Sequence, residues 1–257
     1  MKNISRRNML KKTGGSLGMA VLGVPIIASV NNQEKQKRHT SEIKKILVIG
    51  AHPDDAETAC GGTITLLSKA GHNVVSAYLT RGEAGIKGKT HDQAGKIRTK
   101  EAINACKIMG ARPEFIGQID GNTEVNIQRY NEMFEFIQKE NPDIVITHWP
   151  IDGHRDHRAC SILVYDAWKR MNRNFDLYYF EIDAGDQTQQ FAPSDFVDIG
   201  SVIEEKHKAC RCHISQGMER VLNKFHFIME KFHGIQNQCT YAEAFIRHQQ
   251  VQSELMK

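Results

Sequence analysis

Short apolar runs rich in β-branched residues alternate with longer amphipathic stretches through most of this 257-residue chain. The clearest runs are 45–50 (KILVIG), 73–80 (NVVSAYLT) and 143–147 (DIVIT). Continuous apolar runs of this length are typical of strands that are buried on both faces of a parallel sheet, and strands that alternate with helices favour an α/β fold. We therefore predict a Rossmann-like, mainly parallel twisted sheet with helices on both faces.

The other segments complete this alternation. Helices are expected at 57–70, 94–109, 125–140 and 156–171, and further strands at 113–117 and 177–182. The tail after 197–199 is expected to be mainly helical, because its apolar residues are spaced four, three and four positions apart from Val221 to Phe232.

The first thirty residues differ in character from the rest. The pair Arg6-Arg7 precedes a Gly-rich, uncharged and mildly apolar stretch over 13–30, a pattern that is typical of a twin-arginine export signal. We expect residues 1–30 to form this signal, 31–43 to form a flexible polar lead, and 44–257 to form a single domain. Such a signal predicts export to the bacterial periplasm.

Charge and composition exclude several classes of partner. The chain has a formal net charge of +4, and removal of residues 1–30, which hold five basic residues and no acid, brings it to −1. Nucleic-acid binding requires concentrated positive charge, so no nucleic-acid partner is expected. Glycines and Pro25 dilute an apolar stretch that barely reaches the ~20 residues of a bilayer span, so no stable membrane span is expected. The spacing of the six cysteines favours neither a dense disulfide framework nor a cysteine nucleophile.

Two clusters of acids and histidines lie beyond two of the predicted strands. Ala51–Glu57 (AHPDDAE) directly follows the strand at 45–50, and His154–His157 (HRDH) lies in the loop beyond 143–147. Ligands of open α/β sheets bind outside the carboxyl ends of the strands, where successive loops converge, so the two clusters are expected to meet. A dinucleotide site is not expected, because the first turn lacks G-x-G-x-x-G.

The residue types in these clusters predict a mononuclear metal site. His52, Asp55 and His157 can supply two imidazoles and one carboxylate, and this leaves a fourth position for water, as in catalytic zinc sites. His148 is the main alternative for the third ligand. Asp54 remains uncoordinated beside the metal, which favours a hydrolase over an iron oxygenase or a binding module.

The HPDDAE turn, the later GHRDH cluster and the order of elements resemble the LmbE-like, or PIG-L-type, zinc-dependent N-acetylglucosaminyl deacetylases. Supporting similarities lie at 79–85 (LTRGEAG), 98–102 (RTKEA), 213–216 (HISQ) and 242–245 (AEAF), and the resemblance covers most of the chain from 44 to 247. The departures are modest, chiefly Arg81 before Gly82-Glu83 and Ala56 within the first motif. These departures bear on the choice of substrate.

The resemblance implies that His52, Asp55 and His157 bind zinc and that Asp54 is the general base. The chemistry of these residues agrees with this, because zinc lowers the pKa of a bound water towards ~7 and Asp54 can take its proton as the water attacks an acetamide. Ferrous iron is the alternative metal.

Four further residues are expected to contribute to the site. Protonated His154, with its imidazole held by the Asp156 carboxylate, is expected to stabilise the oxyanion of the tetrahedral intermediate. Arg98 and Glu83 are expected to contact the sugar.

These features predict a metal-dependent hydrolase that removes an acetyl group from an N-acetylated amino sugar of the GlcNAc type or from a related glycoconjugate. The substrate is expected to be a small molecule, and a homo-oligomer is compatible with the sequence. An amidase or esterase that acts on a non-sugar substrate is the main alternative, and a non-catalytic metal- or sugar-binding module is a weaker one.

Overall fold

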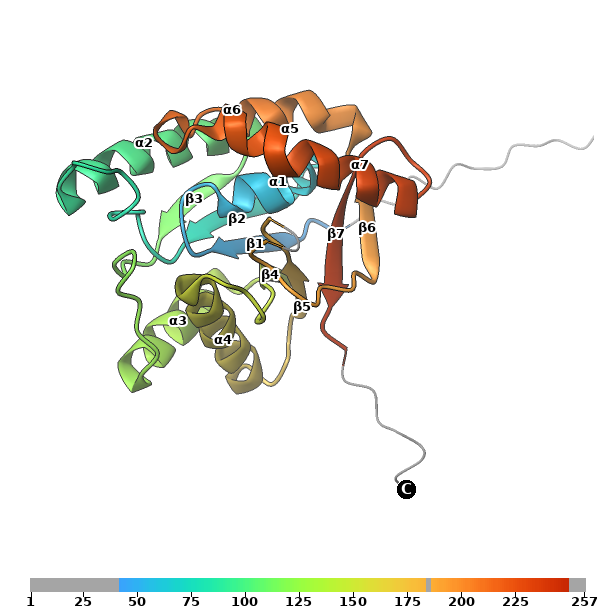
Figure 1. Ribbon diagram of the computed structural model, residues 1–257. Helices are drawn as coiled ribbons and strands as arrows, with labels where there is room; N and C mark the ends of the chain where they lie inside the picture. Colours follow the sequence, from blue (N-terminus) through green and yellow to red (C-terminus); the bar gives the residue numbers. More distant parts are fainter. Residues whose placement is uncertain (1–41, 184–185, 250–257) are drawn as a thin grey trace, which may run out of the picture. The chain divides into compact units, whose positions relative to one another are not determined.

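A computed structural model describes residues 42–183 and 186–249 of the chain (Figure 1). The predicted export signal and most of the predicted lead fall outside these residues, so both assignments stay predictions. Within the described part of the chain, no helix combines the length and the apolar character that a membrane crossing requires.

A seven-stranded sheet forms the centre of the domain, in the order β3-β2-β1-β4-β5-β7-β6. The first five strands in this order run parallel, and β7 runs antiparallel to both of its neighbours. The predicted Rossmann-like, mainly parallel sheet is confirmed. The strands are β1 (Lys45–Gly50), β2 (Asn73–Tyr78), β3 (Arg112–Phe115), β4 (Ile144–His148), β5 (Asp176–Phe180), β6 (Asp195–Asp198) and β7 (Ala242–Arg247).

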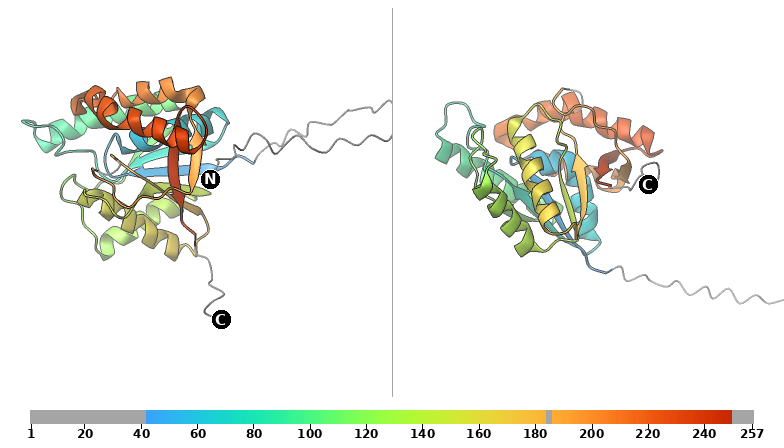
Figure 2. Two further views of the ribbon diagram at one scale, coloured as in Figure 1. Left: turned by 45° about the vertical axis from the view of Figure 1, so that its right-hand side comes forward. Right: turned by 90° about the horizontal axis from the view of Figure 1, so that it is seen from below.

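Helices cover both faces of this sheet, with α3 and α4 on one face and α1, α2 and α5 on the other (Figures 1 and 2). The α-helices are α1 (Asp55–Lys69), α2 (His91–Met109), α3 (Ile127–Glu140), α4 (Arg155–Arg170), α5 (Ile203–Cys210), α6 (Met218–Val221) and α7 (Phe227–Gln236). Short 3-10 turns occur at η2 (Gly200–Val202) and η3 (Ile214–Gln216), and a π-helical turn, η4 (Leu222–His226), lies between α6 and α7.

Strand β1 shows why the apolar runs contain no polar alternation. Leu47 and Ile49 pack in the core beneath α3 and α4, whereas Ile46 and Val48 pack in the core beneath α1 and α2. All four side chains are 0% exposed. Because successive side chains of a strand point to opposite faces and both faces are covered here, every position of the strand is apolar.

The order of the strands creates a crevice between β1 and β4. These strands are neighbours in the sheet, but β1 leads into α1 on one face and β4 leads towards α4 on the other. The loops therefore diverge at the carboxyl ends of the two strands, which is where open α/β sheets bind ligands. This topology brings the segment after Gly50 and the segment after His148 to one edge of the sheet.

The expected helical tail is interrupted by a strand that was not predicted. The residues of β7 include Ala242 and Ala244, which are poor strand formers, and the buried acid Glu243. Glu243 accepts hydrogen bonds from the backbone N–H groups of Gly62 and Thr63, at 2.8 Å each, and so joins β7 to α1. Tertiary contacts of this kind override local propensity.

Candidate active site

A cavity of about 500 Å³ opens at the carboxyl ends of the strands. Its lining combines the two sequence motifs with residues from the loops after β2, β3 and β5, from α2 and from the segment that runs from η3 to η4. The lining residues are His52, Asp54, Asp55, Thr58, Ala84, Gly85, Arg98, Asp120, Gly121, His154, His157, Ile182, Asp183, Gln187, Gln216, Met218, Val221 and His226.

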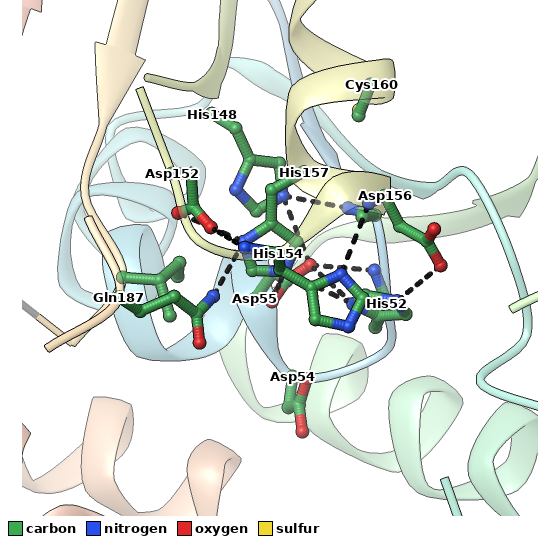
Figure 3. A network of polar contacts seen from close by, with 12 residues as sticks. His52, Asp54, Asp55, His148, Asp152, His154, Asp156, His157, Cys160 and Gln187 are labelled. Atoms are coloured by element: carbon green, nitrogen blue, oxygen red, sulfur yellow. Dashed lines mark hydrogen bonds and ion pairs between the residues drawn. The ribbon is translucent and has the colours of Figure 1, made fainter. Parts of the chain in front are cut away.

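His52, Asp55 and His157 point toward one another in this cavity (Figure 3). Nε2 of His157 lies 3.3 Å from Nδ1 of His52, and the Asp55 carboxylate lies 3.5 Å from each of these two nitrogens. A tetrahedral zinc ion with bonds of about 2.0–2.1 Å separates its ligands by about 3.3 Å. The three predicted ligands therefore fit a zinc ion in both donor type and spacing.

Carboxylates surround the outer face of His52. Its Nε2 lies 3.2 Å from Asp120 and 3.3 Å from Asp156, so Nδ1 is the nitrogen that faces the cavity centre. Burial opposes protonation of the ring, but contacts with Asp120, Asp156 and Asp55 raise the pKa of His52 well above its usual value. Carboxylates that hold the outer nitrogen of a ligating imidazole fix its orientation and increase its basicity.

His157 is held in the same way through its outer nitrogen. Its Nδ1 lies 2.9 Å from Nε2 of Gln187 and 3.3 Å from the Asp152 carboxylate. A ring that binds a metal through Nε2 carries its proton on Nδ1, which can donate to the Asp152 carboxylate. Nε2 of His157 is thereby left to face His52 and Asp55.

His148, the alternative ligand, is buried beside the three predicted ligands. Its ring stacks on that of His157 with centroids 3.9 Å apart, and its Nε2 lies 3.1 Å from the Asp55 carboxylate. The same Nε2 accepts a hydrogen bond from the Ala51 N–H at 2.9 Å, which occupies its lone pair. Burial lowers the pKa of His148 to about 4, so the ring is neutral near pH 7. These contacts favour His157 as the third ligand.

Asp54 lies beside the three predicted ligands and directly before α1, and its backbone is in an unusual conformation. Its backbone φ is 115°, a value that residues other than glycine rarely adopt. Holding a residue in such a conformation costs about 1–3 kcal/mol. The Asp54 N–H donates to the Glu57 carboxylate at 3.2 Å, and Arg98 Nη2 donates both to the Pro53 carbonyl and to Oδ2 of Asp54 at 3.0 Å. Burial raises the pKa of Asp54 despite the Arg98 charge. Contacts on both sides of the residue therefore hold a partly exposed carboxylate in the cavity.

His154 lies next to the three ligand candidates, but its expected partner was wrong. Its ring centroid is 4.7 Å from that of His52, and its Nδ1 accepts the backbone N–H of Asp156. The Asp156 carboxylate instead accepts hydrogen bonds from the Gly121 N–H and the Thr123 hydroxyl, at 2.7 Å each, and contacts His52. Burial and the neighbouring histidines lower the pKa of His154 rather than raise it. Asp156 therefore orients His52.

The two expected sugar contacts occupy different positions. Arg98 lines the cavity, although its guanidinium is committed to Asp54 and Pro53. Glu83 does not line the cavity. It is 3% exposed and accepts hydrogen bonds from the backbone N–H groups of Arg81 and Asp120. Glu83 thus joins the loops after β2 and β3, and a direct contact with the sugar is not supported.

Polar residues of the site that were not predicted from the sequence include Asp120, Asp152, Asp183, Gln187 and His226. Asp120 follows β3 in an Asp-Gly turn, which was the one local signal available. Asp152, Asp183 and His226 lie outside the two motifs, and only the fold brings them to the cavity or to the predicted ligands.

Comparisons with known proteins identify a family and several relatives. Residues 47–168 match the PIG-L family model, which is described as GlcNAc-PI de-N-acetylase. A diacetylchitobiose deacetylase of Thermococcus kodakarensis is 34% identical over 198 residues, which cover 70% of this chain and 73% of that protein. A 4-oxalmesaconate hydratase of Pseudomonas putida is 25% identical over 200 residues, which cover 70% of this chain and 77% of that protein.

A solved structure supports the fold. The N,N'-diacetylchitobiose deacetylase of Pyrococcus horikoshii superposes with a TM-score of 0.71 at 24% identity, covering 80% of this chain and 84% of that chain. The matched segment 47–168 contains both His/Asp motifs and the crevice between β1 and β4. From the family match, the relative at 34% identity and the shared fold, we conclude that this chain belongs to the PIG-L, or LmbE-like, family.

Proposed function

We propose that the protein is a metal-dependent deacetylase that hydrolyses the acetamide of an N-acetylated amino sugar of the GlcNAc type. The observation that carries the proposal is the convergence of three metal-ligand side chains, 3.3–3.5 Å apart, next to the uncoordinated carboxylate of Asp54 in one open cavity. The similarity to a diacetylchitobiose deacetylase supports the choice of substrate class.

The ligands proposed for the metal are His52, Asp55 and His157, and zinc is the preferred ion because two imidazoles and one carboxylate form a common catalytic zinc set. Ferrous iron is the alternative, since the same donors bind it. When bound, the metal supplies a Lewis acid that lowers the pKa of water and polarises the acetamide carbonyl. Asp120, Asp152, Asp156 and Gln187 hold the two imidazoles in the required orientation.

Asp54 is proposed to act as the general base and then as the acid. Its carboxylate takes a proton from the attacking water and returns it to the leaving amine. Arg98 and Glu57 keep this carboxylate at the cavity wall, because they bind its side chain and its backbone N–H respectively. His154 lies beside the ligands, where a ring N–H can donate to the developing oxyanion.

Acetate release tests this proposal directly. Purified protein should release acetate from GlcNAc, from N,N'-diacetylchitobiose or from an aglycone-bearing GlcNAc, and Asp54→Asn should lower the rate ~100-fold or more with unchanged metal content. Asp92→Asn removes an exposed carboxylate on α2 and serves as the matched control.

Different results would point to different functions. Loss of activity together with loss of metal in Asp54→Asn would remove the evidence for a base. An amide or ester outside the sugars would be the substrate if the metal site is filled and no sugar releases acetate. The hydratase relative adds one more assay, the hydration of an activated double bond, in which a positive result would replace the deacetylase assignment.

We also propose that residues 1–30 direct export to the bacterial periplasm through the twin-arginine route, on the basis of the Arg6-Arg7 pair and the uncharged stretch that follows. This route carries folded proteins and would allow metal loading before transport. Cell fractionation of the full chain and of an Arg6→Lys, Arg7→Lys variant tests it. Retention of the variant in the cytoplasm is expected, and equal export of both chains would contradict the proposal.

A further inference from the structure

The cavity has a second polar region around Asp183, a residue that belongs to neither of the two His/Asp motifs. Asp183 lies just beyond β5, the next strand of the sheet after β4, so it belongs to the same edge of the sheet as the proposed ligands. Its φ is 43°, and its carbonyl accepts the N–H groups of Asp186 and Gln187, at 3.1 and 2.9 Å. This turn sets the Asp183 side chain in the cavity lining.

The Asp183 carboxylate is short of partners. Its Oδ1 is buried and makes no hydrogen bond to any residue that the structure describes. Nε2 of His226 lies 3.3 Å from this same Oδ1 but does not meet hydrogen-bond geometry, and His226 is itself 7% exposed. The π-helical turn η4 ends at His226, and single π-helical turns within helices are frequent at functional sites. A buried carboxylate oxygen without a donor is costly, and a bound ligand can supply the donor.

The surroundings of this pair define what it can bind. Ile182, Met218 and Val221 add apolar surface to the same cavity lining. A carboxylate, an imidazole and adjacent apolar groups suit a sugar or polyol ring, because its hydroxyls donate to the acid while its C–H face packs on the apolar side chains.

The charges of the cavity lining favour a neutral ligand over an anionic one. Four lining residues are acids, namely Asp54, Asp55, Asp120 and Asp183, whereas Arg98 is the only lysine or arginine among the lining residues that the structure describes. Arg98 is already paired with Asp54. A divalent metal ion leaves this lining negative overall, and a phosphate or carboxylate next to Asp183 would meet like charge without a free cation.

We propose that Asp183, together with His226, selects substrates in which the N-acetylated sugar is joined to an uncharged sugar or polyol, with Asp183 accepting a hydrogen bond from a hydroxyl of that unit. This rests on the proposed deacetylase function. Substrates with an anionic group at that position are disfavoured.

The test compares a neutral and an anionic substrate that carry the same acetamide. Acetate release is measured on N,N'-diacetylchitobiose and on GlcNAc 1-phosphate for the wild type and for Asp183→Asn. The wild type should prefer diacetylchitobiose by about tenfold or more in kcat/KM. Asp183→Asn should raise KM for diacetylchitobiose by about tenfold or more with little change in kcat. The ratio of kcat/KM for diacetylchitobiose to that for GlcNAc 1-phosphate should therefore fall.

Matched variants separate this role from a structural one. Asp186→Asn removes an exposed acid three residues away that does not line the cavity, and it should leave both KM values unchanged. His226→Gln keeps a side-chain hydrogen-bond donor at this position. It should lower the neutral-to-anionic ratio of kcat/KM, but by less than Asp183→Asn does. In an Asp54→Asn background, binding of both sugars can be measured without turnover, which checks the change in KM.

The outcomes separate this inference from the proposed function. If the wild type releases acetate but Asp183→Asn leaves the neutral-to-anionic ratio unchanged, the inference is overturned and the deacetylase function stands. A wild type that uses GlcNAc 1-phosphate as well as diacetylchitobiose also overturns it. If the wild type releases acetate from no N-acetylated sugar, the proposed function fails and this inference fails with it.

Discussion

Two buried clusters of ionisable groups in this domain differ in whether their charges are matched from within. Lys206 is 1% exposed, and its Nζ lies 2.9 Å from Glu230 and 2.8 Å from Glu243. Glu230 also contacts His207 at 2.7 Å, and Glu243 accepts two backbone N–H groups of α1. Each acid of this cluster is already paired with the Lys206 cation. The cluster therefore joins α5, α7 and β7 to α1 and does not require a ligand.

The cluster of His52, Asp55 and His157 is arranged in the opposite way. Two imidazole nitrogens and a carboxylate, all with lone pairs, converge on one point at the cavity, and their outer atoms are held by further carboxylates. No lysine or arginine makes an ion pair with any of the three in the described chain. A buried polar cluster therefore indicates a binding site where its potential ligand atoms converge on a shared space. It indicates a structural role where its charged groups pair with one another.

Loss of a proposed ligand should have the largest effect. His157→Ala is expected to lose the metal and ~1000-fold or more of the activity, because the metal supplies several kcal/mol of transition-state stabilisation. Metal analysis and acetate release on the same preparation measure this. His91→Ala, which removes an exposed histidine at the start of α2, is the control. A His157→Ala protein with full metal content would show that His148 or another group is the third ligand.

Lys206→Met should affect stability and leave the chemistry intact. Removing the cation leaves two buried carboxylates without their charge partner, which typically costs ~3–5 kcal/mol of unfolding free energy. Urea unfolding of the variant and of Lys208→Met, an exposed lysine on the same helix, measures the difference. Metal content and activity per folded molecule should stay at the wild-type level. A selective loss of activity would contradict the purely structural role of this cluster.

The structural cluster should also make stability depend on acid pH. Although burial opposes it, the Lys206 charge and the His207 hydrogen bond lower the pKa of Glu230 to about 2. A depressed carboxyl pKa contributes stability that is present above the unfolded pKa of about 4.3 and is lost as pH falls towards 2, on the order of 3 kcal/mol in total. Unfolding of the metal-free protein from pH 6 to pH 3 should therefore show a steeper loss for the wild type than for Glu230→Gln. Parallel curves would refute this contribution.

A smaller effect is expected from the carboxylates that orient the ligands. Asp156→Asn should weaken metal affinity by about 10- to 100-fold and should retain activity at saturating metal, since the outer partners of a ligating histidine tune rather than form the site. Competition with a chelator measures the affinity. Asp166→Asn is the control, because it changes an acid on the same helix that does not line the cavity, and it should leave the metal affinity unchanged. An Asp156→Asn protein that is inactive even with a filled site would indicate a catalytic role for Asp156.

The sequence predicted the parts of this molecule whose signal is local. Strand β1 is apolar at every position because both faces are covered, and the HPDDAE turn places His52 and Asp55 within three residues of each other. Segment 242–247 was missed because its strand forms by pairing with the distant strands β5 and β6, and its buried Glu243 finds its donors in α1, 180 residues away along the chain. Long-range contacts of this kind leave no periodic pattern.

The tail and the site show the same limit. Ile228 and Phe232 fit a helical spacing, but they are 61% and 51% exposed, and the π-helical turn just before α7 changes the spacing on which the prediction depended. The Asp156 carboxylate was assigned to His154 because the two are neighbours in sequence, whereas the first turn of α4 directs it to His52. Asp183 carried no motif and reaches the cavity only through the order of the strands.

Titration of metal-free protein with Zn²⁺, and in parallel with Fe²⁺ under anaerobic conditions, measures whether a metal ion at the proposed site is required for activity. Acetate release from N,N'-diacetylchitobiose is measured after each addition. The proposed site predicts negligible release without metal and a rise that ends at one metal ion per chain, with no rise in His157→Ala. Full acetate release by the metal-free protein in excess chelator would show that the reaction needs no metal ion.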